Sequence, residues 1–119
     1  SVRDQLSLAQ IIYECDPQYI YIFEKFTTDI VKSGKEALEI LETKSYDIVL
    51  MDKNINDISG IKTVQILRKS GYKGIIFGFT GDCFSSASES FDCGITGVQD
   101  ILYKPLDIQH FLTLCLKYT

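Results

Sequence analysis

Three polar residues each directly follow a short apolar run, and together they carry the chemistry needed to hold a phosphoryl group. Asp52 follows IVLM, Thr80 follows IIFGF, and Lys104 follows VQDILY. A carboxylate oxygen can act as a nucleophile, a hydroxyl can donate to an anionic oxygen, and an ammonium can neutralise the charge that gathers there. We therefore expect these residues to form a site for phosphate chemistry.

A site of this kind also needs a divalent metal, because a carboxylate and a phosphoryl group repel each other. Glu14 and Asp16 supply carboxylates after an expected first strand, and the backbone carbonyl of Asn54 supplies another oxygen. Together with Asp52, these residues form the expected metal site. Glu14 and Asp16 are equally consistent with an ordinary polar turn.

Apolar runs of strand length alternate with helical patterns from residue 29 onward, which predicts an α/β fold. The expected strands are residues 29–31, 48–51, 75–79 and 98–103. The expected helices begin at the capping residues Ser33, Ser59, Ser86 and Asp107. This alternation implies a parallel sheet whose right-handed crossover helices cover both of its faces. The three polar residues would then emerge at one edge of the sheet, where α/β folds bind their ligands.

The segment 1–26 permits two interpretations. In the first, residues 8–13 form a strand, residues 14–16 an acidic turn, and Pro17 begins a short helix. In the second, apolar residues between Val2 and Cys15 form a helical stripe, and residues 19–23 form a strand. We prefer the first interpretation.

Composition limits the functions that the chain can perform. With 119 residues, 45% of them hydrophobic and 24% charged, residues 1–119 are expected to form one globular domain. A net charge of −4 without a basic patch argues against nucleic-acid binding. Because no apolar stretch could span a membrane and no signal peptide is evident, we expect a cytoplasmic location. The cysteines are expected to be free thiols, since their spacing fits neither a zinc site nor a disulfide scaffold; they are Cys15, Cys83, Cys93 and Cys115.

These residues resemble the response-regulator receiver domains of two-component signalling. In that family a strand ends in the phosphoacceptor Asp, and a loop ending in Gly leads to a helix. The matching segments here are IVLMD, ending at Asp52, and NDISG, ending at Gly60. The family's Thr or Ser after the fourth strand matches Thr80, and its Lys-Pro after the fifth strand matches Lys104 and Pro105. The likeness is good over positions 29–119 and poor over positions 1–26.

The resemblance implies a flavodoxin-like, doubly wound parallel sheet of five strands in the order 2-1-3-4-5, with a shortened first helix. Asp52 would accept a phosphoryl group from the phosphohistidine of a histidine kinase or histidine phosphotransfer protein, with Mg²⁺ as the cofactor. Thr80 and Lys104 would bind the phosphoryl oxygens. The signal would pass to the face formed by the fourth helix, fifth strand and fifth helix, which is also the expected surface for any dimer.

The chain departs from the family pattern at the expected metal site. Receivers carry adjacent acids after the first strand, whereas Cys15 stands between Glu14 and Asp16 here. A soft thiol is a poor ligand for Mg²⁺. Either Asp16 takes its place, or phosphorylation is lost and the domain is a pseudo-receiver that acts only through protein contacts. In neither case do we expect a turnover enzyme.

Smaller departures concern signalling. Ile101 occupies the position of the family's switch aromatic, Tyr103 stands beside Lys104 instead, and Asn56 replaces the usual loop proline. Asn54 and Asp82 lie where they would tune hydrolysis of an acyl phosphate or serve only as polar loop residues, and His110 is expected to be a helical surface residue. A flavin-binding domain of the same architecture is disfavoured, because no phosphate-binding loop rich in Gly, Ser or Thr follows the first strand.

Overall fold

A parallel sheet of five strands forms the centre of the part of the chain that the computed structural model describes, residues 6–12, 26–55, 57–81 and 97–119. The strands are β1 (Leu6–Ile11), β2 (Phe26–Val31), β3 (Ile48–Asp52), β4 (Ile76–Thr80) and β5 (Asp100–Tyr103). They lie in the order β2-β1-β3-β4-β5, and every neighbouring pair is parallel. The structure thus confirms the predicted strand order.

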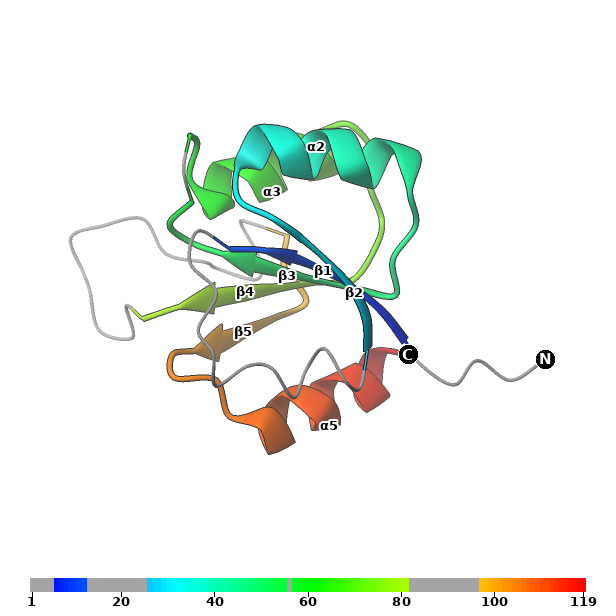
Figure 1. Cartoon of the computed structure of the whole chain (residues 1–119), viewed down its shortest axis with the longest axis vertical. Coiled ribbons are helices and arrows are strands. Elements are labelled where there is room, and N and C mark those ends of the chain that lie inside the picture. Colours follow the sequence, from blue (N-terminus) through cyan, green and yellow to red (C-terminus); the bar gives the residue numbers. More distant parts are fainter. Residues whose placement is uncertain (1–5, 13–25, 56, 82–96) are drawn as a thin grey trace.

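Helices cover both faces of this sheet (Figure 1). α2 (Gly34–Thr43) and α3 (Gly60–Lys69) lie side by side over one face, and α5 (Ile108–Tyr118) lies against the other. Among the described residues, no helix is long and apolar enough to cross a membrane.

β3 is the strand around which both apolar layers are built. All five of its residues are buried. Ile48 and Leu50 point into the layer beneath α5, while Val49 and Met51 point into the layer beneath α2 and α3. A strand buried on both faces needs a continuous apolar run, which is the pattern that predicted it.

Side-chain caps begin the described helices at the predicted residues. The Ser33 hydroxyl accepts a hydrogen bond from the Glu36 amide, Ser59 caps α3 in the same way, and Asp107 accepts from the His110 amide. The predicted capping box at Ser33 is incomplete, because the Glu36 carboxylate accepts from the Lys32 amide one residue further back. Past the end of α3, Gly71 adopts a φ of 99°, a conformation that favours glycine.

Three strands begin two or three residues away from their predicted starts, and one of them is β5, which begins at Asp100 instead of residue 98. β1 begins and ends two residues earlier than the predicted range 8–13, and β2 begins at Phe26 instead of residue 29. Polar residues obscured the starts of the first two strands: Ser7 in β1, and Thr27 and Thr28 in β2. The Gln10 side-chain amide donates to the Thr28 hydroxyl across the β1–β2 pair (3.1 Å), so both polar groups are satisfied inside the sheet. The alternative helix between Val2 and Cys15 is wrong, since β1 occupies the middle of that range.

Several predictions from sequence fall on other parts of the chain. The acidic turn at residues 14–16, the helix beginning at Pro17 and the helix beginning at Ser86 lie outside the described residues, as do Asn56 and Asp82. The same holds for every cysteine except Cys115.

Candidate functional site

The candidate site lies at the carboxyl-terminal edge of the sheet, where β3, β4 and β5 end. Asp52 is the last residue of β3 and is only 4% exposed. Lys104 directly follows β5, and its Nζ lies 2.8 Å from Asp52 Oδ2. Thr80 ends β4 between these two strands and is 5% exposed. The structure therefore brings Asp52 and Lys104 into direct contact and places Thr80 on the intervening strand.

The backbone register of the parallel sheet aligns these strand ends. Asp52 is paired with Phe79, and Thr80 is paired with Tyr103. The ladder continues one residue past β3 and β5, because the Lys53 amide donates to the Phe79 carbonyl (2.9 Å) and the Lys104 amide donates to the Thr80 carbonyl (2.8 Å). Hydrogen bonds thus fix the backbone on both sides of β4 up to the site.

Each carboxylate oxygen of Asp52 has its own hydrogen-bond donor. Oδ1 accepts from the Asn54 amide (3.2 Å), and Oδ2 accepts from the Lys104 ammonium. The ammonium also lies 5.2 Å from the centroid of the Phe79 ring, within the range of a cation–π contact. The Lys104 side chain is 40% exposed and that of Asp52 only 6%, so the lysine can reach solvent while the carboxylate is fixed.

Gly60 is required by the way the chain leaves the site. The Gly60 amide donates to the Lys53 carbonyl (2.7 Å), which closes the loop between β3 and α3. A Cβ at this position would collide with the backbone carbonyl of Asp52. The glycine that ends the loop therefore allows α3 to begin directly against the end of β3.

The donor set at this edge suits a hard cation. Asp52 offers a carboxylate, and Asn54 is an exposed residue of the adjoining loop whose carbonyl is the predicted further ligand. Ile11 pairs with Met51, so β1 ends beside the end of β3. Glu14 and Asp16, the predicted ligands that follow β1, lie outside the described residues, and the described part alone contains no group of three acidic, cysteine or histidine side chains suited to a metal.

The other residues singled out from the sequence differ in their exposure. Tyr103 is 47% exposed, whereas Ile101 packs against the layer beneath α2 and α3. His110 is exposed on α5, as expected. Cys115 is a buried free thiol, and burial raises its pKa to about 12, which keeps the thiol protonated at neutral pH.

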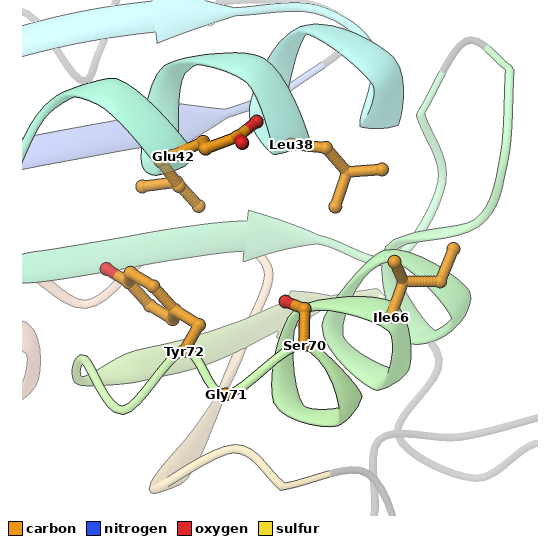
Figure 2. Close-up of a pocket in the computed structure, with 7 residues that line it drawn as sticks. Leu38, Glu42, Ile66, Ser70, Gly71 and Tyr72 are labelled. Atoms are coloured by element: carbon orange, nitrogen blue, oxygen red, sulfur yellow. The ribbon is translucent and has the colours of Figure 1, made fainter.

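A separate hollow of about 450 Å³ lies between α2 and α3 (Figure 2). It is lined mainly by apolar side chains, with Leu38 and Glu42 on one side and Ile66, Ser70 and Tyr72 on the other. Neither Asp52 nor Lys104 lines it, so the hollow is distinct from the charged groups at the sheet edge.

The sequence alone did not identify one residue of the loop next to the site, Asp57. The Asp57 carboxylate accepts hydrogen bonds from the backbone amides of Gly34 and Lys35 at the start of α2. Loop polarity was its only visible feature, since both of its partners belong to a helix that precedes β3 in the chain.

The comparisons with known proteins agree on one family. The model of the response regulator receiver domain matches residues 17–115. The autoinducer 2 sensor kinase/phosphatase LuxQ of Vibrio parahaemolyticus is 31% identical over 84% of this chain and 12% of its own length. The response regulator ArlR of Staphylococcus epidermidis is 28% identical over 93% of this chain and 47% of its own length. The chain thus spans less than half of these two relatives.

Solved structures share the fold. One is the receiver domain of a sensor histidine kinase from Pseudomonas aeruginosa, described with a magnesium ion coordinated in its active-site cleft. Its TM-score is 0.77 at 20% identity, and the match covers 96% of this chain and 97% of the other chain. The chemotaxis response regulator CheY4 of Vibrio cholerae has a TM-score of 0.78 at 17% identity, with coverage of 97% and 99%.

Proposed function

Because this chain belongs to the response regulator receiver domain family, we propose that it accepts a phosphoryl group on Asp52 from the phosphohistidine of a histidine kinase or histidine phosphotransfer protein. The observation that carries the proposal is the contact of 2.8 Å between the buried Asp52 carboxylate and the Lys104 ammonium at the edge of the sheet. An arrangement with a fixed nucleophile and an adjustable cation suits transfer of an anionic group.

In the proposed reaction, an Asp52 carboxylate oxygen attacks phosphorus and forms an acyl phosphate. The bond between phosphorus and the imidazole nitrogen of the donor breaks, and that nitrogen leaves with its bonding electron pair and takes up a proton. Lys104 turns from the carboxylate to a phosphoryl oxygen, and the Thr80 hydroxyl donates to another. The preformed backbone ladder on both sides of β4 keeps these groups aligned.

The oxygen donors expected at this edge suit a bound Mg²⁺, which would offset the negative charge of the carboxylate and the incoming phosphoryl group. Asp52, the Asn54 carbonyl, Glu14 and Asp16 are the residues that would hold it. We expect Asp16 to provide the acid that Cys15 does not, because a hard cation prefers oxygen to sulfur.

We further propose that the signal leaves through β5 and α5, together with the helix expected at residues 86–93, which lies outside the described residues. Two large apolar side chains support this assignment: Tyr103, at the end of β5, is 47% exposed, and Leu116, on α5, is 79% exposed. A partner or a second copy that covered these side chains would remove apolar surface from water. The net charge of −4 makes nucleic acid an unfavourable partner.

In this proposal the chain is a switch in the cytoplasm and not a turnover enzyme, since each transfer modifies its own Asp52 and must be reversed by hydrolysis. A second candidate function is that of a pseudo-receiver that acts through protein contacts alone. The position of Cys15 between the two expected acidic ligands favours this alternative.

Titration with Mg²⁺ and beryllofluoride, a mimic of the acyl phosphate, tests the proposal. We expect millimolar Mg²⁺ to shift the amide resonances of Lys53 and Asn54, and beryllofluoride to bind in its presence. Asp52→Asn removes the coordinating carboxylate and is expected to abolish beryllofluoride binding. If the wild-type amides do not respond to either addition, the pseudo-receiver is the correct assignment.

A further inference from the structure

Asp57 connects the loop after Asp52 to a helix that lies earlier in the chain. Its Oδ1 accepts a hydrogen bond from the Gly34 amide (2.7 Å), and its Oδ2 accepts one from the Lys35 amide (3.0 Å). Both carboxylate oxygens are thus used by successive amides at the start of α2. The first amides of a helix have no partner inside the helix, and they attract negative charge.

The contact is that of an ionised carboxylate. The backbone amide of Ile58 contributes most to holding the pKa of Asp57 below its usual range, and the amides of Gly34 and Lys35 act in the same direction. Asp57 is therefore negatively charged at neutral pH. The start of α2 has two caps: Ser33, from its own chain segment, binds the Glu36 amide, and Asp57, from the loop, binds the two amides before it.

Packing reinforces this connection. Gly34 lies so close to the side chains of Ile58 and Thr63 that a Cβ on it would collide with both. The first turn of α2 therefore rests directly on the loop after β3 and on the first turns of α3. A displacement of this loop cannot leave the start of α2 undisturbed, since close-packed contacts transmit movement.

The same loop is joined to Asp52. The Asn54 amide donates to Asp52 Oδ1 (3.2 Å), and the Gly60 amide donates to the Lys53 carbonyl (2.7 Å). Asp57 lies between these two attachments in the sequence. The loop is consequently attached at three points: to the Asp52 carboxylate through Asn54, to the Lys53 carbonyl through Gly60, and to the start of α2 through Asp57.

We propose that Asp57 is a positioning residue of the phosphoacceptor site, and that it couples the occupancy of Asp52 to the start of α2. It holds the loop so that the Asn54 backbone contacts Asp52, and any ligand that orders this loop also tightens the Asp57 contacts with α2. This inference rests on the proposed function and adds α2 as a responding element on the face of the sheet opposite α5. Because coupling is reciprocal, weakening the α2 contacts must weaken ligand binding at Asp52.

Beryllofluoride binding in saturating Mg²⁺, measured by ¹⁹F NMR, tests the positioning role with a matched control. Asp57→Ala is expected to weaken binding about tenfold, a typical size for coupling between two sites. Ser33→Ala removes the other cap of α2 without touching the loop, and is expected to change the affinity less than about twofold. Asp57→Asn, which keeps one acceptor oxygen, should recover part of the lost affinity.

Hydrogen exchange of the Gly34 and Lys35 amides tests the coupling separately. In the wild type and in Ser33→Ala, beryllofluoride is expected to slow exchange at both amides. In Asp57→Ala, saturating beryllofluoride should leave their exchange rates unchanged.

Two results would overturn the inference alone: equal loss of affinity in Ser33→Ala and Asp57→Ala, or wild-type amides that exchange at the same rate with and without bound beryllofluoride. A wild-type protein that does not bind beryllofluoride at all would overturn the proposed function, and this inference with it. The two failures are therefore distinguishable in the same set of samples.

Discussion

Replacing Lys104 with methionine should destabilise the domain by leaving the Asp52 carboxylate without its cationic partner. Methionine retains most of the apolar stem of the lysine, so the change removes mainly the charge, and with it the contact between the ammonium and the Phe79 ring. Removing one member of a fully buried ion pair costs about 3–5 kcal/mol, and an exposed pair contributes about 0.2–1 kcal/mol. Because the Lys104 side chain is 40% exposed and that of Asp52 is 6% exposed, we expect an intermediate loss of about 1–2 kcal/mol.

Replacing the other member of the pair, Asp52, should destabilise the domain less. In Asp52→Asn, the Lys104 ammonium can turn to water, and the amide oxygen can still accept from the Asn54 amide, so we expect a change of less than about 0.5 kcal/mol. This asymmetry follows from the unequal burial of the two side chains.

Urea unfolding of the wild type, both single variants and the double variant measures the interaction as a double-mutant cycle. We expect a coupling of about 1–2 kcal/mol, since Lys104→Met should cost little once Asp52→Asn has removed the carboxylate. Lys62→Met, on the exposed side of α3, serves as the control and should be nearly neutral. A coupling below about 0.3 kcal/mol would show that the two charges do not interact, and the structural reasoning would be refuted.

Further predictions concern other parts of the fold. Gly60→Ala should destabilise the domain in urea unfolding by about 3 kcal/mol, because the new Cβ meets a strand backbone. In Gly71→Ala the new Cβ meets open space, so we expect a loss of about 1–2 kcal/mol, the cost of the left-handed conformation at this position. Equal losses in the two variants would contradict this reasoning. The Lys44 ammonium is the main cause of the lowered pKa of Asp29, so this pair should stabilise the fold above about pH 4 and lose its effect as the pH falls through the lowered pKa. Asp29→Asn should therefore differ from the wild type in the free energy of unfolding at pH 6. In acid, the two free energies should converge. Cys115, with its pKa raised to about 12, should resist iodoacetamide at pH 8 until urea unfolds the chain, and peptide mass mapping that finds rapid labelling of the native protein would contradict its burial.

The central strand and the charged residue at its end were predictable because their signals are local. The run IVLM predicts a strand buried on both faces, and the structure buries all of β3. Once parallel strands are inferred, a polar residue directly after each apolar run must emerge at the same edge. That reasoning placed Lys104 beside Asp52 although the two are far apart in the chain.

The remaining features depend on partners that a sequence pattern does not identify. Gln10 and Thr28 interrupt the apolar patterns of β1 and β2, yet their hydrogen bond to each other satisfies them within the sheet. Ser7 in β1 is also satisfied by a distant partner, because the Asp47 carboxylate accepts hydrogen bonds from both its backbone amide and its hydroxyl. Asp57 has the pattern of an ordinary loop acid until α2 is placed beside it. In each case the partner is distant in the sequence, so a local pattern does not identify the contact.

The most direct test of the phosphoacceptor assignment is chemical identification of the modified residue. The protein is incubated with acetyl phosphate and Mg²⁺, any acyl phosphate is reduced with borohydride, and the peptides are sequenced by mass spectrometry. Reduction of an aspartyl phosphate yields homoserine, and we predict homoserine at position 52 in the wild type and none at that position in Asp52→Asn. Homoserine at a different aspartate, or unmodified protein after prolonged incubation, would contradict the account.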